Sequence, residues 1–187
     1  MSHPRFFGYG SLVNLATHDY PDARPARIKG WRRVWRHTSL RPAAFLSVEP
    51  CDQTELYGVT ASVPGGDWAA LDAREHAYRR HDVTHQSDQA ELSVSLYAVD
   101  PAHHHGEGEK GPILLSYVDV VVQGYLRVFG EDGAKGFFGT THHWDIPILD
   151  DRAAPVYPRH QKLTASETET VDAALERLGC RIVKASA

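Results

Sequence analysis

The order of strand-like and helix-like segments along the chain predicts an α+β fold. Short segments rich in β-branched and aromatic residues fill the first half, one helix-like segment lies among them, and helix-like segments follow. With 187 residues, of which 42% are apolar, the chain is long enough to bury a core of its own. We therefore expect a single domain over residues 1–187.

The expected strands are alternating or continuously apolar runs that lie between turn residues. The alternation is clearest at 56–63, where the chain reads Leu-Tyr-Gly-Val-Thr-Ala-Ser-Val. A polar loop with several glycines is expected at 102–112, before the later helices. The expected strands cover residues 4–10, 27–38, 41–48, 56–63, 82–85 and 92–99.

The expected helices follow from periodicity, length and end signals. The first covers 67–78, after a Pro-Gly-Gly break, with Asp67 as its N-cap. A second is expected at 113–129, where the length of the apolar run favours a helix over a strand. A terminal helix is expected at 166–178, with Ser166 and Glu169 as a capping box and Gly179 at its end.

Residues 137–160 form a loop-rich C-terminal extension that is too aromatic for a linker and too broken for one regular element. One interpretation is a flap that closes over a pocket and contacts the leaving group. Another is the surface of a homodimer, with Trp144 and Tyr157 as anchors. The third is a packed surface loop without a binding role.

The most informative motif lies near the N-terminus, where a strand-like run leads into Tyr9-Gly10-Ser11-Leu12. Glycine permits a positive φ, or the close approach of a ligand to the backbone. A loop bounded by glycines, with free N–H groups, can hold a small anion such as a carboxylate. The alternative is a strand-turn that binds nothing.

A carboxylate stands in line with apolar residues of the first expected helix. Trp68, Leu71 and Glu75 fall on one face at helical spacing. A carboxylate directed toward a core is paired with a cation, or has a raised pKa, or both. The alternative is that Glu75 faces water beside neighbouring arginines.

Together, these two elements resemble the γ-glutamylcyclotransferase-like families, which include γ-glutamylcyclotransferase, the glutathione-specific ChaC-like enzymes, γ-glutamylamine cyclotransferase and the AIG2-like proteins. The resemblance spans residues 5–130. It rests on the loop Tyr9-Gly10-Ser11-Leu12, on Glu75 near the end of a short helix, and on the weaker pair Tyr117 and Gly124. One departure is His76, which stands where these families often have Gly or Lys.

The resemblance implies a small mixed β-barrel flanked by helices, and an enzyme that needs no cofactor. In the family's reaction, the α-amine of a γ-glutamyl compound attacks its own γ-carbonyl and releases 5-oxoproline and a free amine or amino acid. The resemblance implies Glu75 as general acid and base, and the loop 9–12 as the group that holds the substrate carboxylate and the developing oxyanion. It also implies that Tyr117 lines the pocket, where the alternative is a core tyrosine.

Composition and charge argue against several other classes. The net charge is −4, and the short cationic cluster between Arg27 and Arg36 is expected to be solvated rather than to bind nucleic acid. No run resembles a membrane span or a secretory signal. Cys51 and Cys180 are far apart and compatible with reduced thiols. We expect a cytoplasmic protein that binds a small molecule, with no nucleic-acid or membrane partner.

Two histidine clusters, 103–105 and 142–143, could suggest a metal site. Consecutive histidines rarely face one ion, and the chain contains no His-x-x-x-His or Cys-x-x-Cys motif. We therefore expect no functional metal.

Three functions are consistent with these features, and the first is favoured. They are the cyclotransferase, a non-catalytic member of the same fold that binds a small amino-acid-like ligand or a partner protein, and a metal-dependent hydrolase built on the histidines. The presence of both Glu75 and its loop favours the enzyme. γ-Glutamyl amino acids, glutathione and γ-glutamyl amines differ only beyond the γ-carbonyl, so the motifs do not choose among these substrates.

Overall fold

The computed structural model describes residues 4–89, 91–103 and 111–184 and has an α+β architecture, as the sequence predicts. The main sheet has six strands in the order β4-β5-β1-β3-β2-β7, and a smaller sheet has the order β6-β8-β9. The expected barrel is wrong, because β4 and β7 remain as separate edges and the sheet does not close. The strands are β1 (Arg5–Gly8), β2 (Arg24–Thr38), β3 (Arg41–Ser62), β4 (Tyr78–Asp82), β5 (Val94–Val99), β6 (Ile113–Leu114), β7 (Thr141–His142), β8 (Ile148–Asp150) and β9 (Ile182–Lys184).

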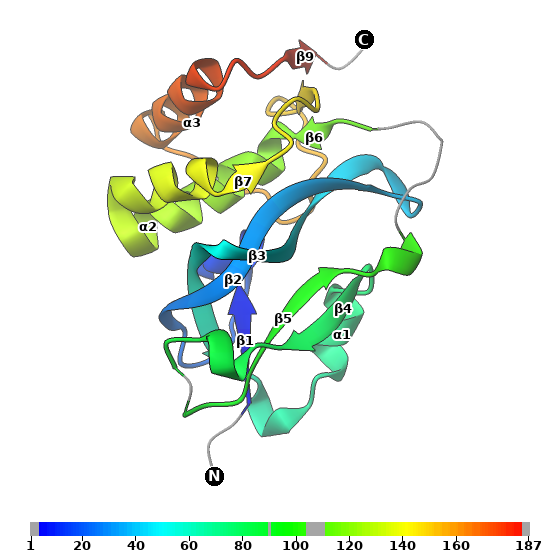
Figure 1. Cartoon of the computed structure of the whole chain (residues 1–187). Coiled ribbons are helices and arrows are strands. Elements are labelled where there is room, and N and C mark those ends of the chain that lie inside the picture. The colour runs from blue at the N-terminus through cyan, green and yellow to red at the C-terminus, as the bar shows by residue number, and fades with distance from the viewer. Residues whose placement is uncertain (1–3, 90, 104–110, 185–187) are drawn as a thin grey trace.

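The two strands expected at 41–48 and 56–63 are one continuous strand, β3. The segment between them stays extended because it continues the antiparallel ladder with β2, in which Trp31 lies opposite Pro50 and Ile28 lies opposite Leu56. Beyond this ladder, β3 also pairs with β1, which in turn pairs in parallel with β5. The long β2–β3 ribbon therefore links the two halves of the molecule, with α2 and α3 on one side and β4, β5 and α1 on the other (Figure 1).

The helices differ from expectation mainly at their ends. Helix α1 (Ala69–Arg74) is short and stops before Glu75, and the next residues enter β4 instead of continuing the helix. Helix α2 (Leu115–Gly139) is broken at Gly130, where φ is 69°, so that its first part ends at the expected end, 129, and a second helical part follows. Helix α3 (Ala165–Arg177) is capped by Thr164 and Glu167, two residues before the expected pair.

Two other expectations need correction. The strand expected at 82–85 is displaced, since β4 ends at Asp82 and Thr84–Gln86 form a 3-10 turn. The extension 137–160 is more regular than expected, because it begins with the last turn of α2 and contains β7 and β8. No described helix combines the length and apolar character that a membrane span requires.

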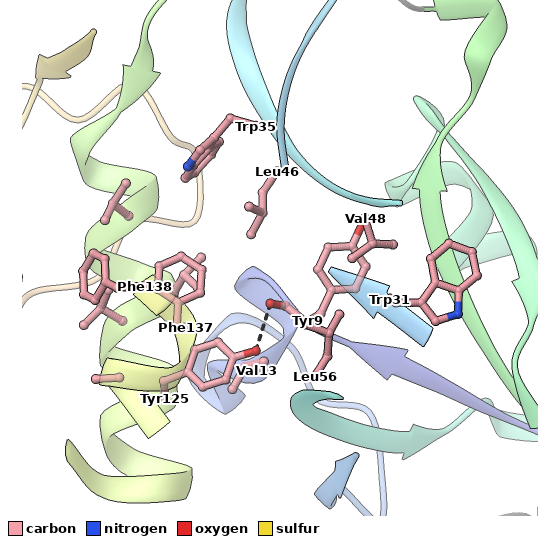
Figure 2. Close-up of a cluster of buried hydrophobic side chains, with 14 of the residues drawn as sticks. Tyr9, Val13, Trp31, Trp35, Leu46, Val48, Leu56, Tyr125, Phe137 and Phe138 are labelled. Atoms are coloured by element: carbon pink, nitrogen blue, oxygen red, sulfur yellow. Dashed lines mark hydrogen bonds between the residues drawn. The ribbon is translucent and has the colours of Figure 1, made fainter. Parts of the chain in front are cut away.

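The main core lies between the β2–β3 ribbon and α2. Figure 2 shows Trp35 and Leu46 from the ribbon facing Tyr125 and Phe137 from the helix, with Tyr9 between the two layers. Trp35 and Tyr125 are almost fully buried, at 1% and 0% exposure. Because the start of the Tyr9 loop lies inside this core, the loop has a fixed place in the fold.

Helix α2 also holds the segment that follows the loop. The Asn14 side chain donates to the Val120 carbonyl and to the Gln123 amide oxygen, at 2.9 and 3.0 Å. Gly124 permits this close approach, since a Cβ at position 124 would stand 2.6 Å from the backbone nitrogen of Asn14. The pair Tyr117 and Gly124 thus lies on the helix that packs against the loop.

Candidate active site

The loop 9–12 leaves β1 as a tight turn and enters a short 3-10 turn, Ser11–Val13. The glycines serve close packing here and not positive φ, because neither Gly8 nor Gly10 has a positive φ. A Cβ on Gly10 would stand 2.7 Å from the Tyr117 hydroxyl oxygen, and one on Gly8 would stand 2.6 Å from the Leu12 Cβ. Glycine at position 10 therefore permits the Tyr117 hydroxyl to reach the loop backbone.

Buried hydrogen bonds fix the loop from behind. The Tyr9 hydroxyl donates to the Tyr97 carbonyl at 2.5 Å, and the Tyr9 carbonyl accepts from Arg33 Nε at 2.9 Å. The Tyr9 carbonyl also accepts from the Tyr125 hydroxyl at 3.0 Å (Figure 2). Arg33 also donates to the Tyr57 carbonyl at 2.5 Å and is 1% exposed. The sequence-based expectation of a solvated cluster at 27–36 is thus wrong for Arg33, which is a buried anchor of the loop.

Glu75 lies immediately after α1, and its N–H closes the last turn by donating to the Leu71 carbonyl at 2.9 Å. Its side chain is 17% exposed and lies 3.2 Å from Arg74 Nε. Burial raises the pKa of the Glu75 carboxyl above its ordinary value, although Arg74 and Arg159 act in the opposite direction. The carboxylate is therefore both paired and partly desolvated.

Tyr117 extends from the first turn of α2 toward the loop. Burial raises the pKa of its phenol, and the nearby Tyr157 and Glu75 act in the same direction. The N–H and hydroxyl of Ser11 act on the same phenol and oppose that rise. The Tyr117 hydroxyl is consequently protonated at neutral pH and can donate a hydrogen bond.

Two adjoining hollows meet at Glu75. The inner hollow, of about 30 Å³, is lined by the loop 9–12 with the end of β1 before it, by Glu75 and by Tyr117. All the site residues expected from the sequence therefore lie around it. The outer hollow, of about 100 Å³, extends from Glu75 toward Arg74, His76 and the C-terminal segment. The shared wall consists of Ser11, Leu46, Glu75, Tyr78 and Tyr117. One carboxylate therefore faces two compartments.

The C-terminal segment brings two further residues, Tyr157 and Arg159, to the outer hollow. The Tyr157 ring packs edge-on against Tyr117 at a centroid distance of 4.9 Å. The periodicity of the chain does not place either residue at a site, because both lie in irregular structure. The sequence offered Tyr157 only as an anchor of a homodimer surface, and a flap over a pocket was one of three interpretations of residues 137–160.

A buried carboxylate holds this segment to the start of α2. Asp151 is 4% exposed and accepts from the N–H and the hydroxyl of Ser116, at 2.8 and 2.5 Å, and from the Val156 N–H at 2.9 Å. The next residue, Arg152, forms paired hydrogen bonds of 2.8 and 2.7 Å with Asp119 on α2. The hydrogen bonds of Asp151 and Arg152 thus attach the segment that carries Arg159 to α2.

Within the described ranges, no group of three or more His, Cys, Asp or Glu side chains is arranged to hold a metal ion. Of the first histidine cluster, His103 lies in a 3-10 turn, whereas 104 and 105 lie outside the described residues. His142 and His143 are exposed, and His143 has a φ of 68°.

A family model described as gamma-glutamyl cyclotransferase, AIG2-like, matches residues 6–116. A solved structure described as gamma-glutamyl cyclotransferase has a TM-score of 0.58 at 12% identity, with 91% of this chain and 98% of that chain covered. The human protein loc79017 has a TM-score of 0.57 at 12% identity, with 90% of this chain and 97% of that chain covered. YkqA from Bacillus subtilis has a TM-score of 0.52 at 19% identity, with 71% of this chain and 51% of that chain covered. No curated protein matches the chain. At these identities the structural likeness shows a shared fold.

Proposed function

Because the chain belongs to the gamma-glutamyl cyclotransferase, AIG2-like family, we propose that it is an enzyme that converts a γ-glutamyl compound into 5-oxoproline and a free amine or amino acid. The substrate supplies both the nucleophile and the electrophile. The enzyme must therefore fold the glutamyl chain into a reactive shape and move protons.

The reaction balances without a co-reactant. The α-amine lone pair forms a bond to the γ-carbonyl carbon, and the oxygen becomes an oxyanion. The oxyanion then collapses and breaks the bond to the leaving nitrogen. One proton passes from the attacking amine to a base and then to the leaving amine, so a single group can serve both steps.

Glu75 is the group that we assign to this proton transfer. It lies where the two hollows meet, and can therefore reach a nucleophile in one and a leaving nitrogen in the other. A carboxyl with a raised pKa binds a proton more readily than an ordinary glutamate does, which suits a group that accepts and then returns a proton.

The loop 9–12 and Tyr117 are the groups that we assign to the glutamyl part of the substrate. They line the inner hollow around Glu75, and the loop is fixed by Arg33 and Tyr125. Backbone N–H groups and a protonated phenol can donate to a carboxylate or to a developing oxyanion. A loop that is already ordered needs little reorganisation when charge develops.

The observation that carries the proposal is a Glu75 carboxyl with a raised pKa that faces a hollow lined by the loop 9–12. The test is release of 5-oxoproline by the purified protein from γ-glutamyl-alanine, glutathione and a γ-glutamyl amine. Glu75→Gln keeps the shape but cannot transfer the proton, and we expect turnover to fall by about 10²–10⁴-fold.

Glu131→Gln is a matched control, because Glu131 is an exposed glutamate of α2 that lies outside both hollows. We expect it to keep most of the turnover. Turnover by the Glu75→Gln variant at the wild-type rate would show that Glu75 is not the acid and base. No release from any of the substrates would favour a ligand-binding member of the family.

A further inference from the structure

The outer hollow has two arginines beside Glu75. Arg74 and Arg159 line it, together with His76 and residues that are apolar or uncharged. The inner hollow has no arginine among its lining residues in the described part of the chain. The two compartments on either side of Glu75 therefore differ in charge.

Both arginines have unused donors. The Arg74 side chain is 10% exposed, donates to the Thr17 carbonyl at 3.2 Å and contacts Glu75, but its Nη2 is buried without a hydrogen-bond partner among the described residues. The Arg159 guanidinium is exposed and has no hydrogen bond or ion pair to any described residue. A buried guanidinium N–H without a partner is costly, so a bound anion would stabilise it.

Resting on the proposed function, we propose that the outer hollow binds a leaving group that carries a carboxylate, with Arg159 and Arg74 Nη2 as its donors. The preferred substrates are then γ-glutamyl amino acids rather than γ-glutamyl amines. Guanidinium groups suit this task because their planar fork matches the two oxygens of a carboxylate.

The geometry explains why the carboxylate belongs to the leaving group. With the glutamyl part in the inner hollow and Glu75 at the junction, the scissile bond lies beside Glu75 and the leaving group extends into the outer hollow. Arg159 stands at the end of the segment that Asp151 and Arg152 attach to α2, so its backbone has a defined position. The Tyr157 ring, which packs against Tyr117, lines the outer hollow together with this arginine.

The test compares three substrates that differ in one group: γ-glutamyl-alanine, γ-glutamyl-alaninamide and γ-glutamyl-ethylamine. The second loses the negative charge and the third loses the carboxylate altogether. We expect kcat/KM for γ-glutamyl-alanine to exceed the other two by about 10- to 100-fold, the range of a charge-assisted hydrogen bond to a carboxylate. The difference should shrink with added salt, because Arg159 is exposed.

Variants identify the residue responsible. Arg159→Gln should lower the preference for γ-glutamyl-alanine about 10-fold, and Arg159→Lys should restore part of it because the charge remains without the fork. Arg181→Gln is the matched control, since Arg181 is exposed and lies outside both hollows. It should keep the wild-type preference.

The outcomes separate the two proposals. Equal kcat/KM for all three substrates, with turnover still abolished by Glu75→Gln, would overturn the carboxylate site and leave the proposed reaction intact. An unchanged preference in Arg159→Gln would overturn the role of Arg159. No 5-oxoproline from any substrate would overturn the proposed function, and this inference with it.

Discussion

At the scale of single residues, Glu75 combines two opposing influences. Its burial favours the neutral acid, whereas Arg74 and Arg159 favour the carboxylate, and burial has the larger effect on the pKa. The sequence indicated the acid through its place beside apolar residues of α1. It also indicated a neighbouring cation, Arg74, but not Arg159, which is brought close only by the tertiary fold.

The pH dependence of turnover follows from this balance. A general base must be ionised, so kcat/KM should fall as the pH drops through the pKa of Glu75. Since that pKa is raised, the fall should begin above the range of an ordinary glutamate. Removing a cation raises the pKa further, so Arg159→Gln should move the acidic limb to higher pH. A pH profile of kcat/KM checks both points, and a limb that moves to lower pH would contradict them.

The raised pKa of Glu75 also predicts that Glu75→Gln, the change that we expect to lower turnover, stabilises the folded protein. In the folded protein the pKa of Glu75 is above its unfolded value, so ionised Glu75 lowers stability at pH values above the folded pKa. Glu75→Gln resembles the neutral acid. It should therefore unfold at an equal or higher temperature than wild type at pH 7–8, and the difference should vanish as the pH falls below the ordinary glutamate range. Thermal unfolding followed by circular dichroism at several pH values measures this, and a variant that is less stable at neutral pH would contradict it.

At the scale of elements, the site depends on the close approach of α2 to the loop 9–12. The motif was visible in the sequence, but the reason for its glycine was not. The sequence analysis considered a positive φ, which concerns one residue alone, but Gly10 does not have one. Glycine is needed at this position because Tyr117 lies close to it, and that contact depends on how the loop and α2 pack. The end of α1 also depends on contacts between distant residues. The sequence predicted a helix through Tyr78, but Tyr78 pairs with β5 and belongs to β4.

This contact makes Gly10→Val a sharp test. The first atom of the new side chain would stand 2.7 Å from the Tyr117 hydroxyl oxygen, so the tyrosine or the loop must move. A displacement of this kind should lower kcat/KM on the order of 10²-fold. Gly136→Ala on α2 is the control, because nothing lies within 4 Å of its added Cβ. Equal activity of the two variants would exclude a role for this contact.

At the scale of the whole molecule, one buried cation joins the site to the core. Arg33 on β2 reaches the carbonyls of Tyr9 and Tyr57 and lies over the ring of Tyr125 at 5.0 Å. A run of cations beside aromatic residues could not reveal which arginine turns inward, because that depends on the register of the β2–β3 ladder. The α+β class was predictable, whereas the open sheet and the anchoring of 150–160 depend on contacts between distant residues.

Replacing this cation should destabilise the whole fold. In Arg33→Met, buried carbonyls lose a charged donor, and we expect the free energy of unfolding to fall by ~2–4 kcal/mol. Arg32→Met is the matched control, since the neighbouring Arg32 pairs with Glu49 and 36% of its side chain is exposed. Its loss should lower the free energy of unfolding much less than the loss of Arg33 does. Chemical denaturation of both variants gives the comparison, and equal losses would contradict the anchor role.

The single long hairpin of β2 and β3 also sets an order of assembly. Its partners are neighbours in the chain, so its loop closes at low entropic cost, whereas the parallel pairing of β1 with β5 joins Phe7 to Leu96. We expect the ribbon to form early in refolding and the surroundings of Glu75 to form last, because they also require Arg159. During synthesis, the ribosome must therefore make most of the chain before Glu75 and Arg159 can come together in the outer hollow.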